Sequence, residues 1–271
     1  MGLPDLLWNT VATKDTRLLG FELSGVFSSG LSDGHVNTLC CREGISWDLD
    51  YVFLRGIGSS EEPHREFLNG YFSGKLPGSP ARGILDVSED GETRLVSTTA
   101  SLCGIEAAMY SGDSAMLEWA VRLHIMLHAF IFTLKGEPLV TESDEYALTY
   151  PESIKGQKPA RVTGSVSNEV FTAIEQLREI RASRRAFSES SGIGLLDLKD
   201  RGMLAIWRYF EGDKLIAVFN FSETEKTADF GKEFGAFRDL MTGERIKKES
   251  VTVPSGGFVW MADDFREEIT E

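Results

Sequence analysis

Cysteine is scarce in this chain, which has three cysteines among its 271 residues: Cys40, Cys41 and Cys103. Neighbouring side chains of a strand point to opposite faces, so Cys40 and Cys41 do not suit pairing with each other. Their spacing also lacks the separation typical of cysteine metal sites. The count therefore excludes a disulfide framework. With no visible secretory leader, an odd number of cysteines predicts reduced thiols and a cytoplasmic location.

Positive charge is also in short supply. The chain has 28 lysines and arginines against 42 aspartates and glutamates, a formal net charge of −14. Such a surface repels phosphate groups, which excludes nucleic acid as a partner. Neutral sugars are compatible with this charge, although an acidic surface is equally compatible with solubility alone.

Uninterrupted hydrophobic runs are missing too. The most apolar tract, residues 115–134, contains Glu118, Arg122, His124 and His128. A charge near the centre of a membrane span costs about 2.5–3.5 kcal/mol on insertion scales, so we predict a buried helix and no membrane partner. The two histidines lie four residues apart on one helix face, but the glutamate of a His-Glu-x-x-His zinc motif is absent. They are expected to be core or interface residues, and neither a metal site nor a cofactor is predicted.

The segment that organises the chain is residues 37–47, Asn-Thr-Leu-Cys-Cys-Arg-Glu-Gly-Ile-Ser-Trp. Residues 36–41 are apolar enough for a short strand, which would leave Arg42 and Glu43 at its end beside Trp47. Parallel α/β folds bind ligands at the carboxyl ends of strands, so all three side chains are candidate site residues. The alternative interpretation is a surface ion pair between Arg42 and Glu43.

Other segments occur in an order that resembles one enzyme family. They are Leu-Trp-Asn-Thr-Val-Ala-Thr (7–13), His-Arg-Glu-Phe-Leu-Asn (64–69), Gly-Ser-Pro-Ala-Arg-Gly (78–83), Val-Ser-Thr-Thr-Ala-Ser-Leu (96–102), Gly-Glu-Pro-Leu-Val (136–140) and Ser-Asp-Glu (143–145). Together with residues 37–47, they resemble the C-terminal part of an amylosucrase, in glycoside hydrolase family 13 of the α-amylase superfamily. The resemblance covers nearly the whole chain and implies glucosyl transfer or hydrolysis at α-glucosidic bonds in carbohydrate metabolism.

Two departures affect the catalytic residues that this resemblance implies. In amylosucrases the strand ends His-Asp-Asp-Ile-Gly-Trp, and the first His-Asp pair contacts the glucosyl unit and stabilises the transition state. Here Arg42 stands at the histidine position and Glu43 at the aspartate position. The family's nucleophilic aspartate and general-acid glutamate lie on the fourth and fifth barrel strands, and this chain resembles only the part after the sixth. The chain alone is therefore expected to be catalytically incomplete.

The resemblance implies an α/β part followed by an all-β part. Residues 1–165 would form the last strands and helices of a (β/α)8 (TIM) barrel, with an inserted loop and helix region at about 48–110. Residues 166–188 would be the last barrel helix, and residues 189–271 an antiparallel β-sandwich. Within the sandwich, two runs with the residue pattern of strands flank residues 211–214, Glu-Gly-Asp-Lys. This arrangement predicts a β-hairpin that turns at these four residues.

The patterns also predict individual elements. Two barrel strands are expected, near residues 36–41 and 138–141. Hydrophobic periodicity predicts helices over about 5–24 and 97–109. A further helix should begin near Asp113 or Ser114 and end before Gly136.

Four more residues are candidate substrate contacts. Arg65 and Arg82 lie near residues 74–91, a stretch rich in Gly, Pro and Asp that we expect to form an irregular loop above the barrel. Asp144 and Glu145 follow the second barrel strand, where the family has Gly-Asp-Glu. The alternatives are solvated surface arginines and a hydrated acidic turn or helix start.

Three functional hypotheses follow. The first is part of an amylosucrase-type enzyme that acts on an α-glucoside or a sucrose-like carbohydrate. The second is a non-catalytic carbohydrate-binding or regulatory relative, and the third a remnant without function. Because a barrel sector has open edges, we expect a homo-oligomer or a partner chain that supplies the missing strands. Residues 190–263 alone should be well behaved, since a sandwich closes on itself.

Overall fold

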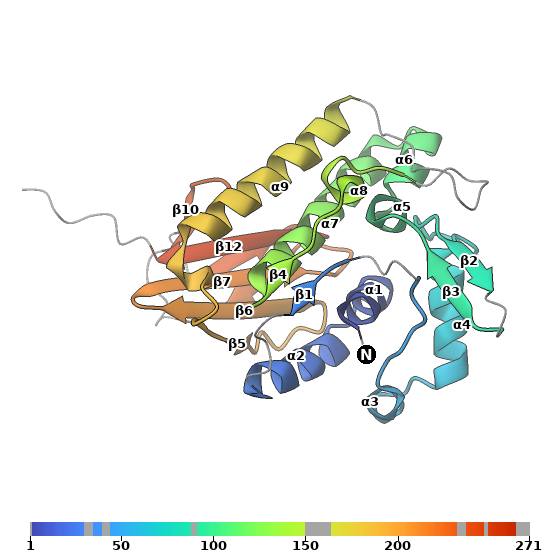
Figure 1. Cartoon of the computed structure of the whole chain (residues 1–271), viewed down its shortest axis with the longest axis horizontal. Coiled ribbons are helices and arrows are strands. Elements are labelled where there is room, and N and C mark those ends of the chain that lie inside the picture. Colours follow the sequence, from blue (N-terminus) through green and yellow to red (C-terminus); the bar gives the residue numbers. More distant parts are fainter. Residues whose placement is uncertain are drawn as a thin grey trace, which may run out of the picture.

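The computed structural model describes residues 2–29, 35–39, 44–87, 91–149, 164–231, 237–246 and 249–263. Helices dominate the first two-thirds of the chain and strands the last third (Figure 1). The helices are α1 (Leu3–Thr13), α2 (Arg17–Ser29), α3 (Tyr51–Gly56), α4 (Glu61–Phe72), α5 (Thr99–Cys103), α6 (Ile105–Ser111), α7 (Ser114–Thr133), α8 (Glu142–Glu145), α9 (Ser165–Ser183) and the 3-10 helix η1 (Arg185–Phe187).

The strands of the described residues form one six-stranded sheet and three two-stranded sheets. The six-stranded sheet has the order β10 (Arg245–Ile246), β9 (Phe237–Asp239), β12 (Phe258–Asp263), β7 (Asp213–Asn220), β6 (Met203–Phe210) and β5 (Gly192–Leu196). The small sheets pair β1 (Val36–Asn37) with β4 (Glu137–Pro138), β2 (Ile84–Val87) with β3 (Thr93–Val96), and β8 (Lys226–Asp229) with β11 (Ser250–Val253).

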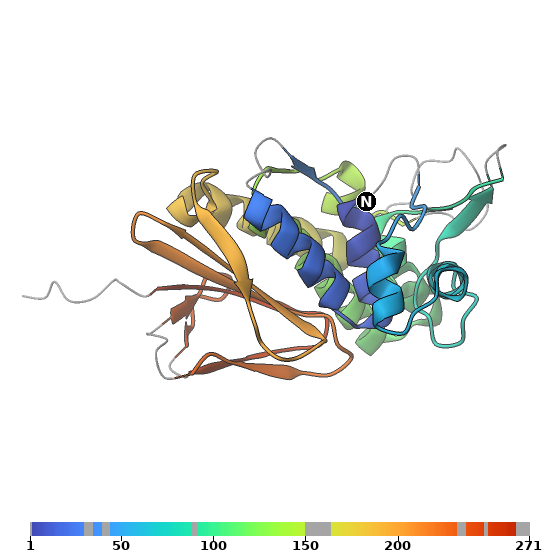
Figure 2. The ribbon, with the colours of Figure 1, turned by 90° about the horizontal axis from the view of Figure 1, so that it is seen from below.

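The six-stranded sheet confirms the predicted antiparallel region at the C-terminal end. Its β6–β7 hairpin pairs Met203 with Asn220 and Phe210 with Asp213, so it turns at the predicted hairpin signal. The small β8–β11 sheet covers one face of the large sheet (Figure 2). There Val218 belongs to the same hydrophobic cluster as Val253. These two sheets correspond to the expected sandwich.

The other face of the large sheet packs against the helices. Phe219 of β7 lies in the same hydrophobic cluster as Phe130 of α7, with ring centroids 4.9 Å apart. The indole N–H of Trp260 donates to Thr133 Oγ1 at 2.9 Å. The expectation that residues 190–263 close on themselves is therefore wrong, because helices of the first two-thirds of the chain, α2 and α7 among them, cover this face of the sheet.

The predicted helix near 114–134 is α7, and it lies at the centre of the molecule (Figure 1). By length and composition alone it could cross a membrane, but 61% of its apolar window is buried inside the protein. Its C-terminal carbonyls are buried and need donors. Arg208, 0% exposed, donates to the carbonyls of Thr133 and Leu134, and Arg181 donates to that of Gly136. These two arginines join the end of α7 to the sheet and to β4.

The two predicted barrel strands are present as a short parallel pair. Val36 pairs with Glu137 and Asn37 with Pro138, although about 100 residues separate the partners. Both strands are shorter than predicted. The chain leaves β4 early because Thr141 forms a capping box with Asp144 and starts α8. Residues 40–43 lie outside the described residues, and a barrel around this pair remains a proposal.

The predicted helix over 5–24 is two helices. Lys14 adopts a left-handed conformation with φ of 57° and ends α1. Two residues later, the Thr16 amide donates to the Arg201 carbonyl at 2.7 Å and its hydroxyl donates to the Met203 carbonyl at 3.1 Å. The break lets the chain dock on the start of β6, a contact that hydrophobic periodicity does not encode.

The predicted helix over 97–109 is also interrupted. Gly104 has φ of 99° and separates α5 from α6. A Cβ there would lie 2.7 Å from Pro80 Cβ, so the approach of residues 79–81 requires glycine. Residues 74–91, expected to be irregular, include β2, which pairs with β3 in an antiparallel hairpin.

Candidate functional site

The candidate site is the region where β1 and β4 end. The catalytic candidates Arg42 and Glu43 lie outside the described residues. Just before them, Leu39 is 1% exposed, and its carbonyl accepts a hydrogen bond from Trp8 Nε1 at 2.9 Å. This buried bond fixes the chain to α1 three residues ahead of Arg42.

Trp47 lies in the core and does not present a ring to solvent. It is 1% exposed, and its indole N–H donates to Asn69 Oδ1 at 2.7 Å. Its ring stacks on Phe72 with centroids 5.5 Å apart. A φ of 59° is strained for a bulky residue, and these contacts to α4 hold it. Trp47 is thus placed to position the segment that contains it against α4.

Arg65 holds the segment that contains Trp47. Its Nη1 donates to the Ser46 carbonyl at 2.8 Å, and its guanidinium lies 5.1 Å from the ring centroid of Tyr51. The Tyr51 hydroxyl in turn donates to the Trp47 carbonyl. Burial raises the pKa of Tyr51 to about 12, so the phenol stays protonated and keeps this bond at neutral pH. The structure therefore brings Arg65 and Trp47 together.

Arg82 is engaged at a different place. Its Nη1 donates to the carbonyl of Ala81 at 2.7 Å and to that of Ser79 at 3.3 Å. Its backbone amide donates to the Ser101 carbonyl of α5 at 3.0 Å. Arg82 thus stabilises the turn ahead of β2, whereas Arg65 stabilises the segment ahead of α3.

Asp144 is buried at the start of α8, where it is 1% exposed. Its Oδ1 accepts from the Thr99 hydroxyl at 2.7 Å, and its Oδ2 accepts from the Thr141 amide at 2.9 Å. Burial alone would raise the pKa of Asp144, but the interaction with His128, the Thr99 hydroxyl and the Thr141 amide hold it below its ordinary value. Its neighbour Glu145 is only partly buried and pairs with Arg178 at 2.8 Å.

The two histidines of α7 are the partners of Asp144 that sequence reasoning missed. Both are 0% exposed, as expected for core histidines. His124 Nε2 lies 2.9 Å from the Asp144 carbonyl oxygen, and His128 Nε2 lies 3.7 Å from Asp144 Oδ1. Burial and the charge of His128 lower the pKa of His124 to about 3, so His124 is neutral and donates through Nε2. Helical spacing showed that the histidines share a face, but nothing in the pattern pointed to Asp144.

A third buried histidine was also missed. His64 of α4 is 8% exposed, and its Nε2 lies 2.7 Å from Asn9 Oδ1 of α1. Burial lowers the pKa of His64, and a neutral ring that donates from Nε2 satisfies the amide oxygen. This bond attaches α4 to α1 close to the Trp8–Leu39 contact.

We call Thr99, His124, His128, Thr141 and Asp144 the Asp144 cluster. Both carboxylate oxygens of Asp144 already accept hydrogen bonds from hydroxyl or amide groups, so the residue is built to hold α8 against α5 and α7. Within the part of the chain that the structure describes, no group of three or more His, Cys, Asp or Glu side chains could hold a metal ion. The hydrogen bonds of this cluster therefore position the chain after β4.

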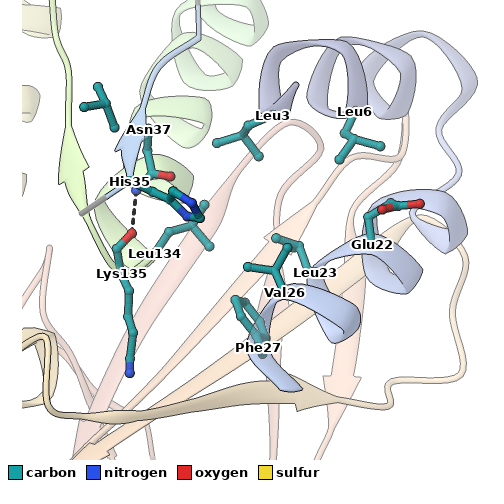
Figure 3. Close-up of a pocket in the computed structure, with 11 residues that line it drawn as sticks. Leu3, Leu6, Glu22, Leu23, Val26, Phe27, His35, Asn37, Leu134 and Lys135 are labelled. Atoms are coloured by element: carbon teal, nitrogen blue, oxygen red, sulfur yellow. Dashed lines mark hydrogen bonds between the residues drawn. The ribbon is translucent and has the colours of Figure 1, made fainter. Parts of the chain in front are cut away.

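A cavity of about 310 Å³ lies at the opposite, amino end of β1 and β4. Figure 3 shows it between the apolar side chains of α1 and α2 and the segment of His35 and Asn37. Asn37 Nδ2 donates to the Lys135 carbonyl at 2.7 Å and ties the two strand entrances together. Ligands of parallel α/β folds bind at the carboxyl ends, so this cavity lies away from the predicted site.

No protein-family model matches the chain. It is similar to solved structures of α-amylase family enzymes. An α-amylase from Anoxybacillus shares 17% identity over 59% of this chain and 35% of that one, with a TM-score of 0.45. The noncanonic maltogenic α-amylase AmyB from Thermotoga neapolitana shares 19% identity over 52% of this chain and 36% of that one, with a TM-score of 0.43.

A third similar structure is the trehalose-6-phosphate hydrolase TreA from Bacillus licheniformis. It shares 15% identity over 52% of this chain and 38% of that one, with a TM-score of 0.41. The chain thus spans little more than a third of the length of each of these enzymes.

Proposed function

We propose that this chain is the C-terminal part of an amylosucrase-type enzyme that transfers or hydrolyses glucosyl units, and that it is catalytically incomplete by itself. The observation that supports this most directly is the parallel pairing of β1 with β4. The sequence resemblance places these segments at the seventh and eighth strands of a (β/α)8 barrel, which are neighbours. Two segments about 100 residues apart are parallel neighbours, as this assignment requires.

In this proposal the site lies at the carboxyl ends of β1 and β4, with the missing strands on a partner chain or on the rest of a longer one. Arg42 and Glu43 follow β1 and would contact the hydroxyl groups of a glucosyl unit. Asp144 holds the chain after β4 through the Asp144 cluster. We propose that Trp47 and Arg65 shape the neighbouring wall, that Arg82 and Glu145 lie at its rim, and that the protein acts in the cytoplasm.

The incompleteness follows from the chemistry of retaining glycosidases. They need a nucleophile and a proton donor whose carboxyl groups lie roughly 5–5.5 Å apart. The resemblance assigns neither carboxylate to a residue of this chain. Glu43 would be a third carboxylate, one that stabilises charge without forming the glycosyl intermediate.

A non-catalytic carbohydrate-binding or regulatory protein is the second candidate. The observation that favours it is the replacement of both members of the family's His-Asp pair, by Arg42 and Glu43. A larger cation and a longer carboxylate at these positions would change the geometry that a glucosyl transition state requires. Binding without turnover is the behaviour that this candidate predicts.

The test combines turnover with complementation. Purified residues 1–271 are assayed with sucrose, maltose and soluble starch, and we expect no glucose release above the blank. A polypeptide that carries the first six barrel strands of an amylosucrase is then added, and we expect turnover only in the mixture, lost with Glu43→Gln. Turnover by the chain alone would refute its incompleteness. An inactive mixture that still binds sugar supports the second candidate.

A further inference from the structure

Trp207 has an unusual setting on the six-stranded sheet. It stands on β6, directly opposite Gly194 of the edge strand β5, and Tyr209 stands opposite Gly192. A Cβ on Gly194 would lie 2.5 Å from Trp207 Nε1 and 2.7 Å from Cε2, and one on Gly192 would lie 3.1 Å from Cζ3. The indole therefore lies across the backbone of β5, in space that only glycine leaves open.

This placement puts aromatic side chains beside an open groove. Leu196, Trp207, Tyr209, Lys214 and Ile216 line a depression of about 420 Å³ on the face that also carries β8 and β11. Tyr209 is 52% exposed, whereas Trp207 is half-buried. Side chains two residues apart on a strand share a face, so both rings border the same groove. Its volume is within the range of small-molecule sites, roughly 300–1,000 Å³.

The groove combines an apolar surface with hydrogen-bond donors. The face of an indole carries partial negative charge and attracts the C–H groups on the apolar face of a pyranose ring. Among the described residues the Trp207 N–H has no acceptor, so it can donate to a sugar hydroxyl. The Tyr209 hydroxyl supplies a further donor. No carboxylate of the described residues lines the groove, which favours a neutral ligand that is rich in hydroxyl groups.

We propose that the groove at Trp207 and Tyr209 binds one glucosyl unit of an α-glucan, at a site separate from the ends of β1 and β4. The choice of an α-linked glucan rests on the proposed function, whereas the choice of a neutral pyranose rests on the groove itself. The sugar ring stacks on the indole, and Gly194 keeps that indole flat. The site would hold a polymeric substrate near the protein without taking part in its cleavage.

Isothermal titration calorimetry of residues 1–271 with maltoheptaose tests the proposal, with cellopentaose as the β-linked comparison. We expect maltoheptaose binding that is weakened about tenfold or more by Trp207→Ala. Trp207→Phe keeps an aromatic ring in the groove and should weaken binding less than Trp207→Ala. Gly194→Ala replaces none of the lining residues but should weaken binding, because its methyl group lifts the indole of Trp207.

Tyr110→Ala is the matched control, because Tyr110 is an aromatic residue that is 75% exposed elsewhere on the surface. Thermal melting of each variant shows whether it is folded. Absence of maltoheptaose binding by the wild type would overturn the proposal, as would unchanged affinity of folded Trp207→Phe and Gly194→Ala. Binding of cellopentaose alone would keep the site but overturn the α-glucan assignment. Maltoheptaose binding is measured on residues 1–271 alone and turnover on the complemented mixture, so either result can fail while the other succeeds.

Discussion

The Asp144 cluster shows how single buried groups connect elements that are distant in the sequence. His124 and His128 come from α7, Thr99 from α5, and Asp144 from α8. Each side chain is buried, and an unpaired polar group in such surroundings costs about 1–3 kcal/mol. The cluster therefore makes the position of α8 specific, and with it the chain that follows β4.

The cluster makes stability depend on pH. Burial and the charge of His128 lower the pKa of His124 from 6.5 to about 3, so below pH 6.5 the unfolded chain binds a proton that the folded protein does not. The contribution of His124 to the free energy of unfolding is thus fully present above pH 6.5 and decreases as the pH falls. We expect the free energy of unfolding to drop by about 2 kcal/mol between pH 7.5 and 5 through this group. The lowered pKa of His64 adds to the decrease.

Urea titrations at the two pH values measure this effect. His124→Gln keeps a donor for the Asp144 carbonyl but does not titrate, so the difference between pH 7.5 and 5 should be smaller. His35→Gln makes the same substitution at an exposed position and serves as the control. An equal pH dependence in His124→Gln and the wild type would show that His124 is protonated in the folded protein.

At the scale of elements, glycines with positive φ determine where helices stop. Gly104 has φ of 99°, and a methyl group on its Cα would lie 2.7 Å from Pro80 Cβ, whereas Gly112 has φ of 69° and open space around it. Gly104 is therefore required both for its backbone conformation and for the close approach of Pro80. Gly112 is required for its backbone conformation alone. Gly25 lies inside α2 with nothing within 4 Å of a Cβ.

Alanine at these three positions should give three different results. Gly112→Ala should cost about 1 kcal/mol from the left-handed conformation alone. Gly104→Ala should cost about 2 kcal/mol or more, because the methyl group must also displace Pro80. Gly25→Ala should stabilise the protein by about 0.5–1 kcal/mol through helix propensity. Urea denaturation at one pH ranks the three, and equal losses at Gly104 and Gly112 would contradict the packing argument.

At the scale of the whole molecule, helices and sheet share one core. Leu204, Ile206 and Trp260 of the sheet lie in the same cluster as Trp8 and Leu127 of the helices. Removing the helices would expose one complete face of the sheet, and a large exposed apolar patch promotes association. The β-rich region therefore depends on the helices that cover this face, α2 and α7 among them, for its stability.

Residues 190–263 expressed alone should consequently aggregate or lack a cooperative melting transition. For residues 1–271 we expect folding with self-association, because β1 and β4 form a two-stranded sheet and Val36 is 61% exposed beside the cavity of Figure 3. Size-exclusion chromatography with light scattering, followed by thermal melting, decides both points. A monodisperse, cooperatively melting fragment 190–263 would show that its second face closes without the helices.

The sequence by itself determined those features of this protein that depend on neighbouring residues. Alternating apolar residues on both sides of Glu-Gly-Asp-Lys predicted the β6–β7 hairpin, because strand period and turn chemistry are encoded in neighbouring residues. Asp113 and the apolar run after it predicted α7, and the helix begins there with an Asp113 cap. The ordered segments of the amylosucrase resemblance located the two strands that pair in parallel.

The tertiary structure alone decided where those elements are interrupted and which polar groups meet. Thr16 breaks the first helix because it bonds to residues nearly 190 positions away, and Trp47 is buried because α4 folds over it. Asp144 finds His124 and His128 only after α8 packs against α7. These contacts depend on the three-dimensional approach of segments whose local patterns are independent of each other, so no periodicity or spacing in the chain could reveal them.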